Sequence, residues 1–136
     1  MFSVETLIRV RYADTDQMKF VYYAKYFEYF EQGRSDLLRE IGLPYSEIEK
    51  RGIYLPVIEA RAEYSKPVRF DNLLKVKTIL QETPESRMTI SYEIANEATK
   101  KLLVTGHTVH SFVYSQSGKP TRAPEFFLNA LKQRSQ

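Results

Sequence analysis

The chain has 136 residues, of which 43% are hydrophobic and 27% charged, a balance that is ordinary for one globular domain spanning residues 1–136 and too apolar for a disordered chain. It contains no cysteine, which excludes disulfides, thiolate metal ligands and a cysteine nucleophile. The net charge is +3, with 8 Lys/Arg against 10 Asp/Glu in residues 1–60 and 12 against 7 in residues 61–136. The second part therefore offers a mildly cationic surface, which suits a phosphate-bearing ligand but is more often an ordinary solvated face.

The sequence shows no targeting or membrane-spanning segment. Its first residues contain no uninterrupted apolar run of signal-peptide length, so a cytoplasmic location is expected. The longest stretch without Asp, Glu, Lys or Arg runs from Leu102 to Gly118 and is interrupted by polar residues. That alternation predicts a strand and not an integral membrane segment.

The first third of the chain predicts a strand, a polar turn and a long helix. Apolar and polar residues alternate from Val4 to Tyr12, which is the period of a half-buried strand. After a turn at 13–16, apolar residues recur from Tyr23 to Ile41 at the i, i+3, i+4, i+7 spacing of a helix. Gly33 in mid-helix costs ~1 kcal/mol relative to Ala, and we expect another backbone to approach closely there.

The rest of the chain is expected to be mainly β-structure. A short helix is predicted at 45–50, and half-buried strands at 58–65, 74–81, 88–94 and 102–115, followed by a turn at 117–120 and a short helix at 124–131. One long aromatic helix followed by antiparallel strands must be buried against their sheet. The expected fold is α+β, a curved antiparallel sheet wrapped around a long central α-helix.

Two carboxylates, Asp14 and Asp16, lie between the first strand and the long helix. An Asp-x-Asp pair usually caps a helix or shapes a turn, but two carboxylates are more than one cap requires. The first turn of a helix leaves backbone N–H groups unpaired, and these can stabilise developing negative charge. A carboxylate directed at the same point would complete a small acyl-transfer site.

Other chemistries find little support in the sequence. His107 and His110 are the only histidines and should point to opposite faces of a strand, so we expect no metal site and no cofactor. No Gly-x-Ser-x-Gly elbow or phosphate-binding glycine loop is present. Aromatic pairs at 22–23, 26–27 and 29–30 could stack on bases, but their helical spacing favours core packing. We therefore expect no nucleic acid partner.

The segment Arg-Tyr-Ala-Asp-Thr-Asp at 11–16, with Val-Tyr-Tyr at 21–23 and then Tyr26, Glu31 and Arg34, resembles the signature of hotdog-fold acyl-CoA thioesterases of the 4-hydroxybenzoyl-CoA thioesterase type, including the Tol-Pal-associated bacterial members. The resemblance extends over most of the chain. The helix, the Tyr-x-Lys-Pro segment at 64–67 and the turn at 118–120 lie where that family has them.

This resemblance implies the roles of particular residues. Asp16 would be the catalytic carboxylate, and the backbone N–H near Tyr23 would polarise the thioester carbonyl. Further substrate contacts are expected from residues of the same segment and, for the CoA tail, from one basic residue further along: Gln17, Phe20, Val21 and Arg87. The family acts as dimers or larger oligomers with the site at the subunit interface, so we expect a homodimer or homotetramer that binds acyl-CoA.

Two positions depart from the family pattern. The family usually has Gly three residues after its aspartate, where this chain has Lys19, and many bacterial members have His where this chain has Tyr23. The main hypothesis is an acyl-CoA thioesterase in which Asp16 is either the nucleophile or the general base. The alternatives are a hotdog protein that binds acyl-CoA or acyl-carrier protein without hydrolysis, and a basic RNA-binding module. The sequence does not distinguish aromatic from aliphatic acyl groups.

Overall fold

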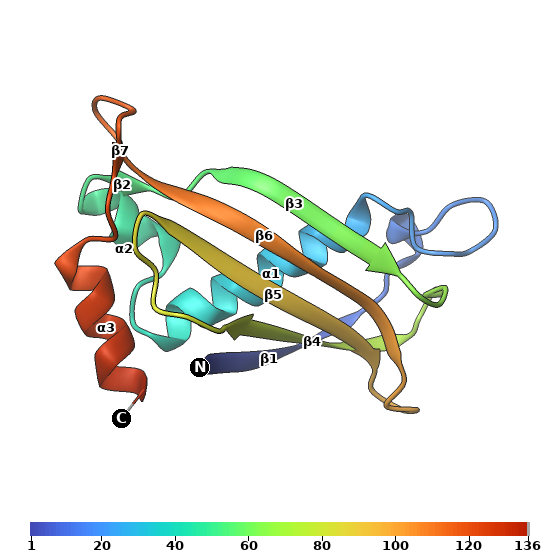
Figure 1. Ribbon diagram of the computed structural model, residues 1–136. Helices are drawn as coiled ribbons and strands as arrows, with labels where there is room; N and C mark the ends of the chain where they lie inside the picture. The colour runs from blue at the N-terminus through green and yellow to red at the C-terminus, as the bar shows by residue number, and fades with distance from the viewer. Residues whose placement is uncertain (136) are drawn as a thin grey trace.

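The computed structural model describes residues 1–135 and shows a curved sheet wrapped around one long helix, α1 (Lys25–Glu40) (Figure 1). Every pairing in the sheet is antiparallel, in the order β1-β4-β5-β6-β2, with β3 and β7 also paired to β6. The strands are β1 (Phe2–Arg9), β2 (Ile53–Tyr54), β3 (Val57–Tyr64), β4 (Leu73–Leu80), β5 (Arg87–Asn96), β6 (Leu102–Tyr114) and β7 (Pro120–Thr121). The two remaining α-helices are α2 (Tyr45–Lys50) and α3 (Glu125–Ser135). The expected α+β architecture is confirmed.

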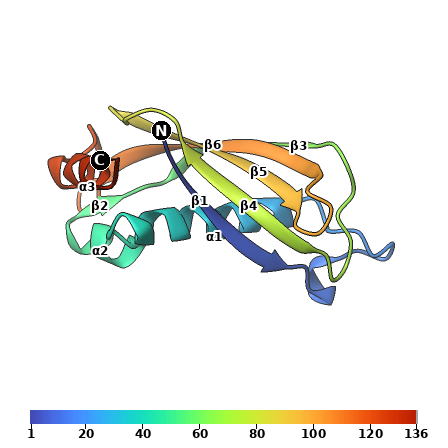
Figure 2. The same cartoon turned by 90° about the horizontal axis from the view of Figure 1, so that it is seen from below.

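Helix α1 lies along the concave side of the sheet (Figure 2). Its buried side chains follow the spacing expected from the sequence and include Tyr26, Tyr29, Phe30, Leu37 and Leu38. The Phe30 ring stacks on Tyr92 of β5, with centroids 4.3 Å apart and an 8° angle between the planes. Core packing of the helix aromatics is therefore confirmed for these residues, although the side chains of Tyr22 and Tyr23 before the helix are exposed.

Gly33 has a close neighbour, but not the one that the sequence suggested. A Cβ atom at this position would overlap Thr78 Oγ1 and lie 3.2 Å from Val76 Cγ1, both on β4. The helix therefore approaches side chains of its own sheet, and not another backbone. Gly33 consequently gives no support to a second subunit.

Several predicted boundaries shift in the structure. The first strand ends at Arg9, because the chain turns into a short 3-10 helix at Tyr12–Asp14 before it reaches α1. The short helix at 45–50 is confirmed, whereas the two-residue strands β2 and β7 were not predicted because they are too short to show a period. The predicted half-burial of β3 is wrong. Val57 and Ile58 are both exposed, at 44% and 46%, because β3 is paired only with β6.

Candidate active site

The loop between β1 and α1 is tied to the segment that follows β3. Val21 N–H donates to Val68 O at 2.8 Å, and Phe70 N–H donates to Lys19 O at 3.2 Å. Within the loop, Thr15 and Val21 form an antiparallel bridge. These contacts hold the loop at the N-terminal end of α1, where sequence analysis placed the reactive carboxylate.

Asp16 is exposed in this loop, but backbone hydrogen bonds fix its orientation. Its Oδ1 accepts hydrogen bonds from the N–H groups of Met18 at 2.8 Å and Phe20 at 3.2 Å. Its own N–H donates to Phe20 O at 2.8 Å. A carboxylate held in this way remains open to solvent and substrate while its direction is set by the loop.

Asp14 has a structural environment. It is only 4% exposed, and its Oδ2 accepts hydrogen bonds from Tyr29 Oη at 2.9 Å and from Arg11 N–H at 3.2 Å. Burial alone would raise the pKa of Asp14, but the hydrogen bonds from Arg11 and Tyr29 outweigh it, so the pKa lies below its ordinary value. Burial and the bond to Asp14 also raise the pKa of Tyr29, which keeps that hydroxyl a donor. Asp14 therefore anchors the turn to α1.

In the described chain, the start of α1 leaves several backbone N–H groups without a backbone acceptor, among them those of Tyr23 and Ala24. Lys25 N–H donates to Tyr22 O at 2.9 Å, and Tyr22 N–H donates to Asp14 O at 2.9 Å. Among residues 1–135, no backbone carbonyl accepts from the N–H of Tyr23 or Ala24. Two such groups at a helix N-terminus can together bind a developing oxyanion.

Tyr23, which carries one of these donors, lines an open hollow of about 300 Å³. Its lining is largely aromatic and apolar and consists of Phe20, Val21, Tyr23, Tyr26, Tyr64, Ser65, Lys66 and Pro67. Burial and, after it, the nearby Tyr64 raise the pKa of Tyr26 to about 12; a hydrogen bond with the Val68 backbone opposes this, and the negative charge of Asp16 adds the smallest contribution. The Asp16 carboxylate lies beside the hollow, because its Oδ1 accepts a hydrogen bond from the N–H of Phe20, which lines the hollow.

The structure brings together most, but not all, of the residues predicted for the site. Phe20, Val21 and Tyr23 line the hollow, whereas Gln17 is exposed in the loop outside its lining. Arg87 begins β5 and lines a separate hollow with residues of the β4–β5 turn. Tyr64, which lines the first hollow, and Ile94 of β5 both pair with Val104 of β6. Ile94 is seven residues from Arg87 along β5, which corresponds to roughly 23 Å at ~3.3 Å per residue. Within one chain, Arg87 and Asp16 therefore lie at opposite ends.

Sequence reasoning missed the contribution of Tyr64 and Tyr26 to the hollow. Their rings are 5.0 Å apart, and the Tyr64 hydroxyl donates to Tyr23 O at 3.2 Å. The Tyr-x-Lys-Pro segment at 64–67 was the available signal, but it suggested only similarity and no contact. A hydrogen bond that spans 41 residues of sequence has no local pattern.

The loop position occupied by Lys19 is explained by its backbone. Lys19 has φ +67°, in the left-handed region that glycine adopts most easily. Lys19 therefore adopts a backbone conformation that glycine, the usual residue at this position in the family, would favour. The departure at this position does not prevent the loop from closing around Asp16.

The two histidines lie on opposite faces of β6, as predicted, and neither belongs to the site. His110 is fully buried, with Thr108 Oγ1 2.8 Å from Nε2 and Leu55 O 3.2 Å from Nδ1. Because the Leu55 carbonyl can only accept, Nδ1 carries the proton and Nε2 accepts from Thr108. Burial, with a smaller contribution from the Arg34 charge, lowers the pKa of His110 to about 4, although the Leu55 contact opposes it.

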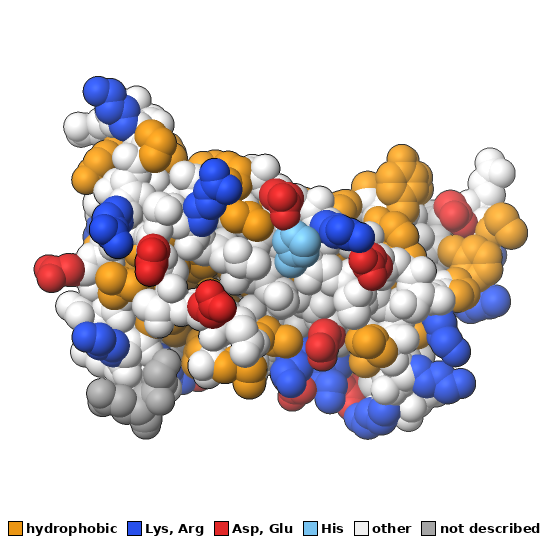
Figure 3. Space-filling view, in the orientation of Figure 1, with side chains coloured by type: hydrophobic (Ala, Val, Ile, Leu, Met, Phe, Trp, Pro, Cys, Tyr) orange, Lys and Arg blue, Asp and Glu red, His pale blue; other side chains and the backbone are white. Residues whose placement is uncertain are grey.

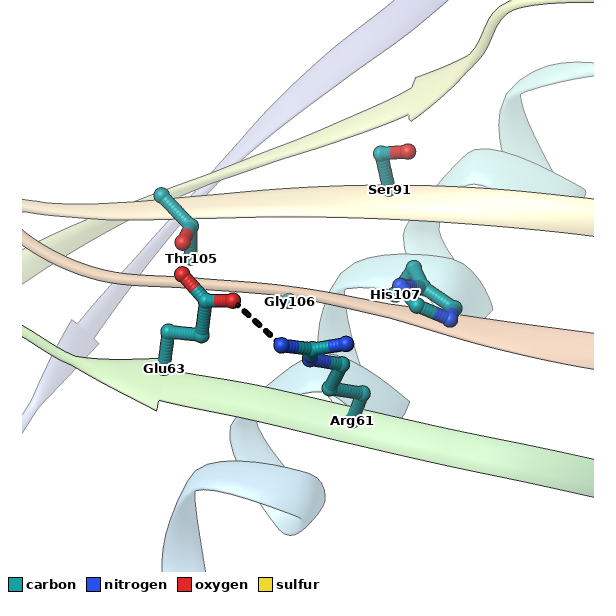
Figure 4. Close-up of a pocket in the computed structure, with 6 residues that line it drawn as sticks. All are labelled: Arg61, Glu63, Ser91, Thr105, Gly106 and His107. Carbon is teal, nitrogen blue, oxygen red and sulfur yellow. Dashed lines mark hydrogen bonds and ion pairs between the residues drawn. The ribbon is translucent and has the colours of Figure 1, made fainter.

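On the outer face of the sheet, His107 and Glu59 form a pair at 2.6 Å and Arg61 and Glu63 form one at 2.9 Å. Arg61, Glu63 and His107 line a shallow hollow together with Ser91, Thr105 and Gly106 (Figure 4). Figure 3 shows acidic and basic side chains scattered over this face. This face lies on the side of the sheet opposite α1 (Figure 2), and these four charged side chains are paired with one another.

Neither a metal site nor a membrane helix is evident in the described chain. Within residues 1–135, no three His, Asp or Glu side chains are grouped so that they could hold a metal ion. In the same residues, no helix is long and apolar enough to cross a membrane.

Known proteins share both the sequence and the shape of this chain. Residues 10–131 match the family model described as the thioesterase-like superfamily. The chain is 34% identical over 120 residues to YneP of Bacillus subtilis (strain 168), provisionally named an acyl-CoA thioesterase, with 88% of this chain and 86% of that protein covered. It is 26% identical over 126 residues to YbgC of Escherichia coli O157:H7, named an acyl-CoA thioester hydrolase, with 93% of each covered. A crystal structure of a DHNA-CoA thioesterase from Staphylococcus aureus superposes with a TM-score of 0.89 at 32% identity, covering 99% of this chain and 90% of that one.

Proposed function

The chain belongs to the thioesterase-like superfamily, and from that premise we propose that it hydrolyses the thioester of an acyl-CoA to the free acid and CoA, with Asp16 as the catalytic carboxylate. The sheet wrapped around α1 is the hotdog fold of such enzymes. One observation carries the assignment of the site. The oriented Asp16 carboxylate and the open N–H groups of Tyr23 and Ala24 belong to one short segment beside an apolar hollow.

In this proposal the acyl group enters the hollow and its carbonyl oxygen accepts from the N–H groups of Tyr23 and Ala24. As the carbon becomes tetrahedral, the negative charge on that oxygen grows, and preorganised donors in a partly dry site stabilise it more than water does. The donors are the backbone groups, so replacement of the family's histidine by Tyr23 leaves them in place. Phe20 and Val21 contact the acyl group or the adjoining arm of CoA, and Gln17 contacts the part of the substrate outside the hollow.

Asp16 can act by two routes. In the first, a carboxylate oxygen attacks the carbonyl carbon, CoA leaves as the thiolate, and water hydrolyses the resulting anhydride to the acid and the regenerated carboxylate. In the second, Asp16 takes a proton from the attacking water, and that proton passes to the departing CoA thiolate. A single turnover in H₂¹⁸O always places ¹⁸O in the acid by the second route, so unlabelled acid would identify the first route, with water attacking the Asp16 side of the anhydride.

A homo-oligomer completes the site in this proposal. The outer edge of β3 has no strand beside it in the described chain, and Val57 and Ile58 are exposed there. A second copy that paired its β3 with this edge would satisfy the open backbone groups and cover both side chains. In such an assembly, Arg87 of a neighbouring copy can approach a CoA bound beside Asp16. Light scattering distinguishes a dimer from a tetramer, and a 16.0 kDa particle at micromolar concentration would contradict the proposal.

The test of the activity is hydrolysis of a panel of aromatic and aliphatic acyl-CoAs, followed with a reagent that reports free thiol. The wild type should release CoA from at least one of them. Asp16→Asn should lower kcat by ~10²–10⁴, the usual worth of a positioned base, or more if Asp16 attacks covalently. Glu31→Gln is the matched control, because within residues 1–135 this exposed carboxylate pairs only with Arg34, at 3.9 Å.

Two outcomes of that experiment would contradict the assignment. Near-normal turnover by Asp16→Asn would mean that another group is the catalyst. Binding of acyl-CoA without any release of thiol by the wild type would instead favour a binding protein. The RNA-binding alternative loses its main support, because Tyr26, Tyr29 and Phe30 are buried in the core.

A further inference from the structure

Strand β3 carries a β-bulge at its start. Val57 pairs with His110 of β6, and the register then shifts by one position, so Ile58 is an extra residue on β3. Opposite residues of an antiparallel pair point to the same side of the sheet. Val57 therefore shares the helix-facing side with the buried His110, and alternation along the strand puts Ile58 on the same side as the partly buried Ala62. The bulge thus presents two neighbouring apolar side chains on the side of α1, and both are exposed.

The sequence of β3 limits how a second copy can pair with its open edge. When a strand pairs antiparallel with its own copy and both helices stay on one side of the joint sheet, one residue lies on the two-fold axis and faces itself. With Arg61 on the axis, two arginines would face each other and Glu59 would face Glu63, which places like charges together. A glutamate on the axis would have the same fault. With Ala60 on the axis, the bulge at Ile58 would lie inside the ladder and interrupt it.

The register centred on Ala62 avoids both problems. Arg61 of each copy then faces Glu63 of the other, on the outer face where these two side chains already pair within one chain at 2.9 Å (Figure 4). Residues 60–64 of the two copies form a regular ladder, and the bulge lies outside it. At the axis, the small side chain of Ala62 faces its own copy, so the strands can pair without a clash.

This register brings the bulge of one copy to the candidate active site of the other. The partner's Ile58, four positions from the axis, lies opposite Lys66, four positions from the axis on the other side. Lys66 and its neighbours Ser65 and Pro67 line the hollow. The hollow and the two exposed side chains of the bulge are both on the helix-facing side, so the apolar surface of one covers the open mouth of the other.

We propose that Ile58 of the partner subunit forms a wall of the acyl hollow beside Asp16 and limits the size of the acyl group that the site accepts. The inference rests on the proposed function, because it completes the same site with a side chain from a second copy. Each site then takes its carboxylate from one chain and its specificity-determining residue from the other.

The register is tested by disulfide formation, because the chain contains no cysteine. Two cysteines can form a disulfide only where their Cα atoms lie about 4.4–6.8 Å apart, which here holds between copies for the residue on the axis. Ala62→Cys should therefore give covalent dimers on mild oxidation, whereas Ala60→Cys and Arg61→Cys, the matched controls, should not. A covalent dimer of either control, no covalent dimer of Ala62→Cys, or a monomeric wild type would overturn the inference.

The role of the side chain is tested with Ile58→Trp, which reduces the room in the hollow. The ratio of kcat/KM for larger acyl-CoAs to that for acetyl-CoA should fall by about tenfold or more, and Ile58→Ala should shift the preference towards larger acyl groups. Leu7→Trp is the control, since Leu7 is also exposed but lies on β1, at the other edge of the sheet. Its acyl preference should equal that of the wild type. An unchanged preference in both Ile58 variants would overturn the inference.

Hybrid dimers show whether Ile58 acts from the partner. Co-expressed Asp16→Asn and Ile58→Trp chains form dimers in which one site combines the intact Asp16 of one chain with the intact Ile58 of the other. Hydrolysis of larger acyl-CoAs should then exceed that of either variant alone. An Ile58 that acted within its own chain would leave no intact site, so the absence of any gain would overturn the inference. If the wild type hydrolyses no acyl-CoA, the proposed function fails, and the cysteine series still decides whether the pairing that brings Ile58 to the hollow exists.

Discussion

Replacement of Asp14 by Asn should lower the stability of the protein, in contrast to the same change at Asp16. The Asp14 carboxylate is buried and accepts from Tyr29 Oη and Arg11 N–H, with Arg11 Nη2 at 3.4 Å and Lys25 Nζ at 3.9 Å from its other oxygen. Asparagine has the same shape but only one acceptor oxygen and no charge. Its amide group would therefore direct donors at the cations of Arg11 and Lys25.

The size of the effect follows from these contacts. A hydrogen bond to a charged group contributes about 1.5–3 kcal/mol and one to a neutral group about 0.5–1.5, so weakening the bonds from Tyr29 and Arg11 costs about 2 kcal/mol. The opposed donors add a little, because the Arg11 side chain is 73% exposed and well screened. We expect a total of about 2–3 kcal/mol, which for a chain of this size lowers Tm by roughly 6–12 °C.

The assay is urea unfolding of both Asn variants at pH 7, together with kcat at a temperature where each is folded. Asp14→Asn should unfold early but retain turnover while folded. Asp16→Asn should lose turnover and keep its stability within about 1 kcal/mol, since an Asn Oδ1 can still accept from Met18 and Phe20. The reasoning is refuted if Asp14→Asn unfolds at the wild-type midpoint and has lost its activity, because Asp14 would then be the catalytic carboxylate.

Two further predictions concern His110 and Arg87. The pKa of His110 lies at about 4 in the folded protein, against 6.5 ordinarily, so the unfolded chain binds the proton more tightly. The free energy of unfolding should therefore fall as the pH drops from 6.5 to 4, by at most about 3 kcal/mol. The urea midpoint of His110→Gln should lack this part of the pH dependence, and an equal change of midpoint with pH in both proteins would contradict the prediction. Arg87→Ala should raise KM for acyl-CoA by about threefold to tenfold with kcat nearly intact, because a phosphate contact far from the thioester contributes equally before and during the reaction, and an unchanged KM at low salt would remove Arg87 from the CoA site.

The elements that sequence periodicity predicts best are those whose burial is one-sided. Helix α1 and strands β4 to β6 each present one face to the core, and their residue patterns record it. Strand β3 also alternates, yet all of it except the partly buried Ala62 is exposed in this chain, because α1 covers little of this strand. Periodicity shows that a face is apolar, but not which partner covers it.

The two aspartates show a different limit of sequence reasoning. Asp14 and Asp16 are two residues apart in one polar turn, and nothing local distinguishes an anchor from a catalyst. The distinction comes from Tyr29, 15 residues later, whose hydroxyl reaches Asp14 because α1 passes behind the turn. The assignment of Asp16 depended on family resemblance, and the physical reason for it needs the tertiary structure.

The loop around Asp16 combines an unfavourable backbone conformation at Lys19 with hydrogen bonds to the Asp16 carboxylate. Lys19 in the left-handed region costs ~1–2 kcal/mol relative to glycine, and the hydrogen bonds from Met18 and Phe20 to Asp16 Oδ1 offset that cost. In residues 1–135 these side-chain bonds all go to Oδ1, so in the proposed mechanism Oδ2 is the oxygen that attacks the carbonyl carbon or accepts a proton from water. The hydrogen bonds that hold the loop closed thus fix one carboxylate oxygen and leave the other open for the proposed reaction.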